Sequence, residues 1–148
     1  MPRSIPSELA SFNKLSGRLY VELTSPAEPL VPGMGMVKAT PGAKIQAISL
    51  NAQVFEGDDL RELTDKELDA VALRAPSVRI AGLAGIPVEH RAPNGTHFTV
   101  RELLAAIERT EHQTRGSSEW FGGIDVHHVY FEGLYPEAED VWSVCWGS

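Results

Sequence analysis

The sequence predicts a single α+β domain over residues 1–148, with a mainly antiparallel sheet of about five or six short strands and two helices on one face. The chain has 148 residues, enough for one domain with a real hydrophobic core. Its 13 glycines and ten prolines indicate many turns, and therefore short strands. Two capping-box patterns mark helix starts, and the segments around them alternate with the two-residue period of strands.

The first elements are a helical turn and three strands. Residues 6–9 favour a helical turn, within a segment, 1–16, that we expect to be partly frayed. Residues 19–23 and 44–50 have the composition and alternation of strands. Residues 36–39 are expected to form a shorter strand that ends at a Thr-Pro-Gly turn.

The first helix is expected to begin at Thr64. Thr64 and Glu67 form a capping box, in which each side chain accepts a hydrogen bond from the backbone of the other residue. Pro76 disfavours helical geometry at Ala75, which predicts a helix over 64–74.

The second helix is expected over 100–115, with Thr99 and Glu102 as its capping box. One side of this helix carries the apolar residues Val100, Leu103, Leu104 and Ile107, followed by Glu111 or Thr114. Glu111 and Arg115 are four residues apart, so we expect an ion pair worth a few tenths of a kcal/mol.

The remaining strands follow from alternation and turn residues. Residues 78–83 are expected to form a strand and 86–90 an extended segment. Residues 125–132 alternate, and 141–146 can pair with them across a loop at 134–140. The sequence therefore predicts a C-terminal β-hairpin.

Negative charge is concentrated at the C-terminal end. From Gly116 onward there is no lysine or arginine, and this segment holds six carboxylates and all three tryptophans. The net charge is −7, with 14 acidic and 13 basic residues before Gly116. Such a surface repels nucleic acid and anionic membranes, and it steers basic proteins toward itself.

Three further features bound the class of protein. No run of apolar residues is long enough to span a membrane. The N-terminus lacks the apolar core of a secretory signal, which predicts a cytoplasmic protein. Cys145 is the single cysteine, so an internal disulfide and a thiolate-rich zinc site are excluded.

The C-terminal region supplies the candidate binding surface. Its acidic and aromatic residues are Glu119, Trp120, Phe121, Tyr135, Glu137, Glu139, Asp140 and Trp142. Large aromatic side chains often dominate interface energy, which favours a contact role. On a two-residue period, however, Trp142 and Trp146 share the larger face of their strand, and that face is the better candidate for packing on a helix. Both interpretations remain open from the sequence.

We therefore expect a non-catalytic binding protein of the inhibitor or immunity type. It would mask a basic partner, such as a toxin or nuclease, whose active site is built for phosphates that the carboxylates imitate. No motif pairs a nucleophile with a base, so the sequence assigns no catalytic residue and no cofactor.

Two alternatives come from other classes of protein. Asp125, His127, His128 and Glu132 could bind a divalent transition metal in a small hydrolase or isomerase. His128 and Glu132 lie about 13 Å apart along a strand, so a site would need Asp125, His127 and a residue from elsewhere. Alternatively, the chain is a subunit of a homo-oligomer with its tryptophans at the interface between copies.

Overall fold

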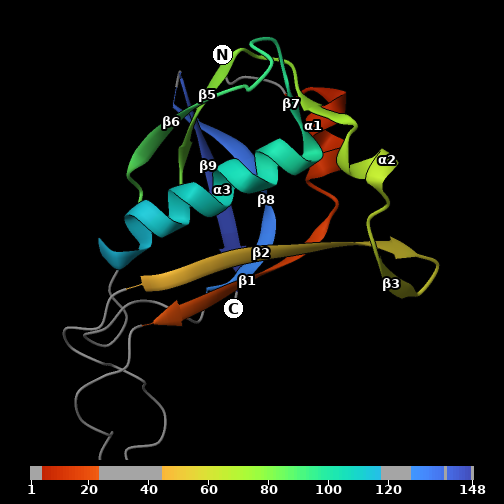
Figure 1. Ribbon diagram of the computed structural model, residues 1–148, viewed down its shortest axis with the longest axis horizontal. Coiled ribbons are helices and arrows are strands. Elements are labelled where there is room, and N and C mark those ends of the chain that lie inside the picture. The colour runs from red at the N-terminus through yellow and green to blue at the C-terminus, as the bar shows by residue number, and fades with distance from the viewer. Residues whose placement is uncertain (1–4, 24–44, 118–127, 139, 148) are drawn as a thin grey trace, which may run out of the picture.

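The computed structural model describes residues 5–23, 45–117, 128–138 and 140–147, which form an α+β fold (Figure 1). Its helices are α1 (Ser7–Phe12), α2 (Asp65–Leu68) and α3 (Val100–Thr114), the last followed by the 3₁₀ turn η1 (Arg115–Ser117). Its strands are β1 (Ser16–Leu23), β2 (Ile45–Glu56), β3 (Asp59–Glu62), β4 (Val71–Leu73), β5 (Ser77–Ala81), β6 (Pro87–Arg91), β7 (Phe98–Thr99), β8 (Tyr130–Ala138) and β9 (Val141–Gly147). The predicted strand 36–39 lies outside the described residues.

Seven strands form one sheet in the order β3-β2-β1-β8-β9-β5-β6. Neighbouring strands are antiparallel, except that β5 and β9 are parallel. Strands β4 and β7 form a separate antiparallel pair. The expectation of a mostly antiparallel sheet in an α+β fold is thus confirmed, although the sheet has more strands than predicted.

The core lies between one face of the large sheet and helices α1 and α3. Helix α3 runs across this face and contacts β2, β5 and β6 (Figure 1). The completely buried side chains at this contact include Leu103 and Ile107 from α3, Leu19 from β1 and Ile80 from β5. Helix α3 has 15 residues, and no helix in the described ranges has the length and apolar character that a bilayer crossing requires.

Helix α3 begins as the sequence predicted, but α2 does not extend as expected. Both capping boxes are present, at Thr64 and at Thr99. The predicted helix over 64–74 is wrong, because α2 ends at Leu68 and residues 71–73 form strand β4. This strand pairs with β7, and Val100 N–H donates to Ala70 O at 2.9 Å. Pairing with a segment distant in sequence therefore outweighs local helix propensity.

Two hairpins of the large sheet differ from the prediction. The hairpin of β2 and β3 turns at Gly57, whose φ of 65° favours glycine. Its two strands pair through Phe55 and Leu60, among other residues. The sequence analysis did not identify β3. The C-terminal hairpin is present, but β8 continues to Ala138 through the segment that was predicted to be a loop.

Glu111 and Arg115 form the predicted i,i+4 pair, but both side chains are 0% exposed. Arg115 Nε donates to Glu111 Oε1 at 2.6 Å, while Leu83 N–H and Trp146 Nε1–H donate to Oε2 at 3.0 and 3.3 Å. Gly82 makes room for this carboxylate, because a Cβ there would overlap Glu111 Oε2. The value of a few tenths of a kcal/mol applies to exposed pairs, whereas the structure places this pair in the interior, where removal of one partner would leave an uncompensated charge.

His90 forms a second buried polar contact, between β6 and α3. Its Nε2 lies 2.7 Å from Thr110 Oγ1, and the Thr110 hydroxyl donates to Ala106 O at 2.9 Å. With the hydroxyl proton in that bond, Oγ1 can accept a hydrogen bond from His90 in the tautomer that carries its proton on Nε2. Burial, together with a smaller repulsion from Arg109, lowers the pKa of His90 from 6.5 to about 4.

We expect the protein to lose stability as the pH falls from 6.5 toward 4. In this range the unfolded chain takes up a proton at His90 that the folded chain does not, so the free energy of unfolding falls by up to about 3 kcal/mol. Above pH 6.5 the imidazole is mostly neutral in both states, and its contribution becomes flat. Urea denaturation across this pH range measures the effect, and a His90→Gln variant with an equally steep pH dependence would contradict it.

Candidate functional site

Three residues of the predicted binding surface lie exposed on the C-terminal hairpin. Tyr135 is 40% exposed on β8, and its hydroxyl donates to Glu132 O at 3.1 Å. Glu137 is exposed near the end of β8, and Asp140 is exposed immediately before β9. The hairpin therefore brings two carboxylates and an aromatic ring to the surface of one element. The predicted residues Glu119, Trp120, Phe121 and Glu139 lie outside the described residues.

Trp142 is not a surface residue. It is 7% exposed, Trp146 is 9% exposed, and both belong to the hydrophobic core. They alternate with Ser143 and Cys145 along β9, so that the indole rings lie on the face that packs beneath α3. The expectation that Trp142 is an exposed anchor is therefore corrected, because the larger face of the strand fills the core.

The alternative metal site is described only in part. His128 is half-buried just before β8, and Glu132 is exposed on that strand. Asp125 and His127, which were expected to supply the same-face ligands, lie outside the described residues. Among the residues that the structure describes, no group of three or more His, Cys, Asp or Glu side chains is arranged to hold a metal ion.

No described helix packs on the face of the large sheet opposite α3, and we call this face the open face. It carries five of the six large hydrophobic side chains that are exposed in the described chain. These five are Tyr20 on β1, Phe55 on β2, Leu60 on β3, and Tyr130 and Tyr135 on β8. The sixth, Ile86, lies in the connection between β5 and β6. Apolar contact area is thus concentrated on one side of the sheet.

Arg18 lies near the centre of the open face between two of these rings. Arg18 and Tyr130 are direct cross-strand partners, and Tyr20 follows two residues later on the same face. The Arg18 guanidinium carbon lies 5.0 Å from the centre of the Tyr20 ring and 5.6 Å from that of Tyr130, within the range of cation–π attraction.

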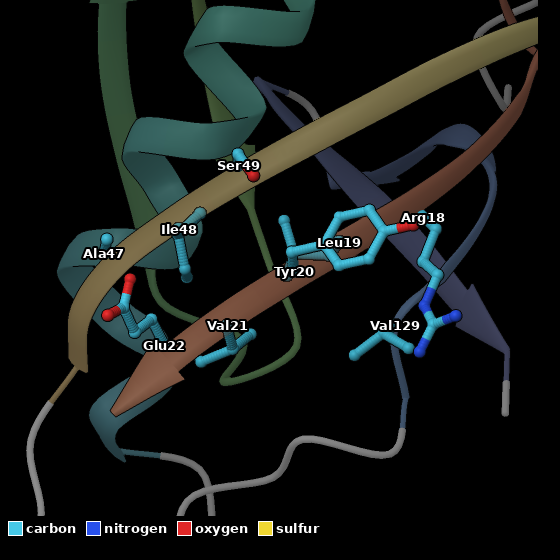
Figure 2. Close-up of a pocket in the computed structure, with 9 residues that line it drawn as sticks. All are labelled: Arg18, Leu19, Tyr20, Val21, Glu22, Ala47, Ile48, Ser49 and Val129. Carbon is cyan, nitrogen blue, oxygen red and sulfur yellow. The ribbon is translucent and has the colours of Figure 1, made fainter. Parts of the chain in front are cut away.

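A shallow groove of about 290 Å³ lies beside this cluster (Figure 2). Figure 2 shows Arg18 and Tyr20 side by side on β1, with Val129 next to the guanidinium. The groove is also lined by Glu22, Ala47 and Ser49. The sequence analysis did not single out Arg18 or Tyr20. The alternation of residues 18–22 is visible in the sequence. The sequence does not show, however, which face of the sheet the helices cover.

Comparison with known proteins gave no match from protein-family models, curated proteins or solved structures.

Proposed function

We propose that this protein is a non-catalytic binding protein of the inhibitor type, which masks a basic protein partner through the end of its C-terminal hairpin. The observation that supports this most directly is the exposure of Tyr135, Glu137 and Asp140 on one hairpin. No lysine or arginine follows Arg115 in the sequence, so this surface contains no cation from its own segment.

The physical basis of the proposal is steering followed by anchoring. A net charge of −7 raises the local concentration of a cationic partner, and carboxylates near the hairpin turn orient it. Tyr135 then supplies a rigid contact, because its ring packs over Gly133, where the absence of a Cβ leaves room. The buried tryptophans have no part in this contact; they hold the hairpin against the core.

The test is the association rate with a basic toxin or nuclease, beginning with the product of any adjacent reading frame. We expect Glu137→Lys combined with Asp140→Lys to lower the association rate constant by roughly tenfold at low salt, because both charges act during the encounter. The rate for the unmodified protein should fall steeply with added salt, and that for the variant much less. Stopped-flow mixing at several salt concentrations measures both effects.

A matched control changes the net charge equally at other positions. Glu62→Lys combined with Glu89→Lys alters exposed glutamates on β3 and β6, the two edge strands of the sheet. If this control slows association as much as the hairpin variant does, the hairpin is not the contact surface. Failure of every basic partner to bind would reject the proposed function.

A further inference from the structure

We infer that a pocket beside helix α1 binds a small amphipathic amine, whose apolar body fills the pocket and whose ammonium group contacts Glu8. This inference is independent of the proposed function, which uses the end of the β8–β9 hairpin. It rests on the apolar walls of the pocket, on the sign of the charges that line it and on the hydrogen bonds that these charges already make.

The pocket lies where several elements meet at one side of the fold. Helices α1 and α2 and the hairpin of β2 and β3 lie at the right-hand side of the molecule in Figure 1. Residues of α1, β2, α2, β4 and α3 together line a pocket of about 370 Å³. This volume is near the lower limit for small-molecule sites, which range from about 300 to 1,000 Å³.

The walls of the pocket are mostly apolar. They are formed by Phe12, Leu15, Val54, Leu63, Val71 and Val100. Phe12 and Val100 are buried in the core, whereas the other four are half-buried. An apolar ligand would therefore remove half-buried hydrocarbon from water without displacing the core, and such burial is the main source of affinity in pockets of this kind.

The charged residues that line the pocket are negative. Glu8 and Glu67 belong to the lining, and no lysine, arginine or histidine does so among the described residues. Each carboxylate has an arginine partner, Arg74 for Glu8 and Arg61 for Glu67, but neither arginine is part of the lining. An anion in the pocket would thus meet carboxylates, whereas an ammonium group would meet opposite charge.

The existing hydrogen bonds decide which carboxylate can bind the ammonium group. Glu67 accepts from two nitrogens of Arg61, at 2.7 and 3.0 Å, and from the backbone N–H and hydroxyl of Thr64, at 2.9 and 3.1 Å. Its acceptor capacity is therefore used within the chain. Among the described side chains, only Arg74 donates to Glu8, from Nε to Oε2 at 2.9 Å. The Glu8 carboxylate thus keeps acceptor capacity for a ligand.

The ion pair of Glu8 and Arg74 leaves room for this role. The Arg74 side chain is 67% exposed and that of Glu8 is 32% exposed, so water weakens the attraction between them. An ammonium group in the pocket would meet the same carboxylate between apolar walls, where screening by water is reduced. Ser11 lines the pocket one helical turn after Glu8 and adds a hydroxyl acceptor at the same end.

The test is a titration with 2-phenylethylamine that is followed by heteronuclear NMR. We expect a dissociation constant of roughly 1 mM, as is typical of so small a ligand, and shifts in the methyl signals of Val54, Val71 and Val100. The uncharged 2-phenylethanol should bind about tenfold more weakly, because it lacks the charge-assisted hydrogen bond. Phenylacetate, an anion of similar size, should bind more weakly still, and methylammonium, which has no apolar body, should cause no shift.

Two substitutions isolate the contact with the ammonium group. Glu8→Gln should lower the affinity for the amine by about tenfold and leave the affinity for the alcohol unchanged, because only the amine uses the charge. Arg74→Gln should instead raise the affinity for the amine by about threefold, because it removes the competing cation. Both variants should remain folded, since an exposed ion pair contributes little to stability.

Ser11→Trp and Ala10→Trp form a matched pair on α1. Both positions are exposed, but only Ser11 lines the pocket. Ser11→Trp should therefore abolish binding of the amine and the alcohol, whereas Ala10→Trp should leave both unchanged. The inference is overturned if the amine shifts none of the three valines at about 20 mM, well above the expected dissociation constant. It is equally overturned if the amine and the alcohol bind equally well, or if Glu8→Gln leaves the affinity for the amine unchanged.

Discussion

Replacing Glu111 by alanine should lower the free energy of unfolding by about 3–5 kcal/mol, one of the two largest effects that we expect in this chain. Glu111 accepts hydrogen bonds from Arg115, Leu83 and Trp146, and its side chain is completely buried. Without the carboxylate, the guanidinium of Arg115 remains in the interior with its counter-charge removed, and two further donors lose their acceptor. Urea denaturation measures the change.

A matched control separates this effect from a general loss of acidic charge. Glu89→Ala removes an exposed glutamate from β6 and should change the free energy of unfolding by less than about 0.5 kcal/mol. Replacing both Glu111 and Arg115 by methionine should recover much of the loss, because two apolar side chains leave no isolated charge. A loss below about 1 kcal/mol for Glu111→Ala would contradict the buried network, since that is the range of exposed pairs.

The second large effect is expected at Trp146. Trp146→Ala should cost about 3–5 kcal/mol, as is typical when a buried aromatic residue is truncated. The indole packs edge-on against Phe131 with ring centres 6.1 Å apart, donates from Nε1 to Glu111, and lies 5.2 Å from the guanidinium carbon of Arg115. Its loss therefore opens a cavity and removes one donor from the Glu111 carboxylate.

Phe55→Ala is the control for Trp146, because Phe55 is 60% exposed on the β2–β3 hairpin. Its free energy of unfolding should change by less than about 1 kcal/mol. Unfolding should be followed by far-ultraviolet circular dichroism, since the Trp146 substitution alters the fluorescence signal itself. If both variants lose equal stability, or if Trp146→Ala loses none, the indole is not part of the core as described.

The helix starts could be predicted because their signal is local. Thr99 and Glu102 satisfy each other's backbone within four residues, so that α3 begins where the pattern says. The same signal at Thr64 was correct, but the extent of α2 was not. Residues 71–73 pair with β7, which lies far along the chain, and a local propensity contains no information about that pairing.

In the candidate site, too, a local pattern could be predicted, whereas the packing of distant segments could not. Alternation along β9 correctly indicated that Trp142 and Trp146 share a face, but it did not decide which face is buried. The structure decides this by placing α3 and α1 on one side, with Phe12 and Phe131 ring centres 5.5 Å apart beneath α1. As a result the tryptophans become core residues, and Tyr20, Tyr130 and Arg18 become the exposed cluster.

The sequence by itself determined the α+β class, the starts of the two capped helices, the presence of a C-terminal hairpin and the concentration of acidic residues near the C-terminus. These properties depend on composition or on residues a few positions apart. Only the tertiary structure decided the strand order, the burial of the Glu111–Arg115 pair and the identity of the open face. The physical reason is that burial depends on which distant segments pack together, and a two-residue or four-residue period is the same whether a face meets water or the core.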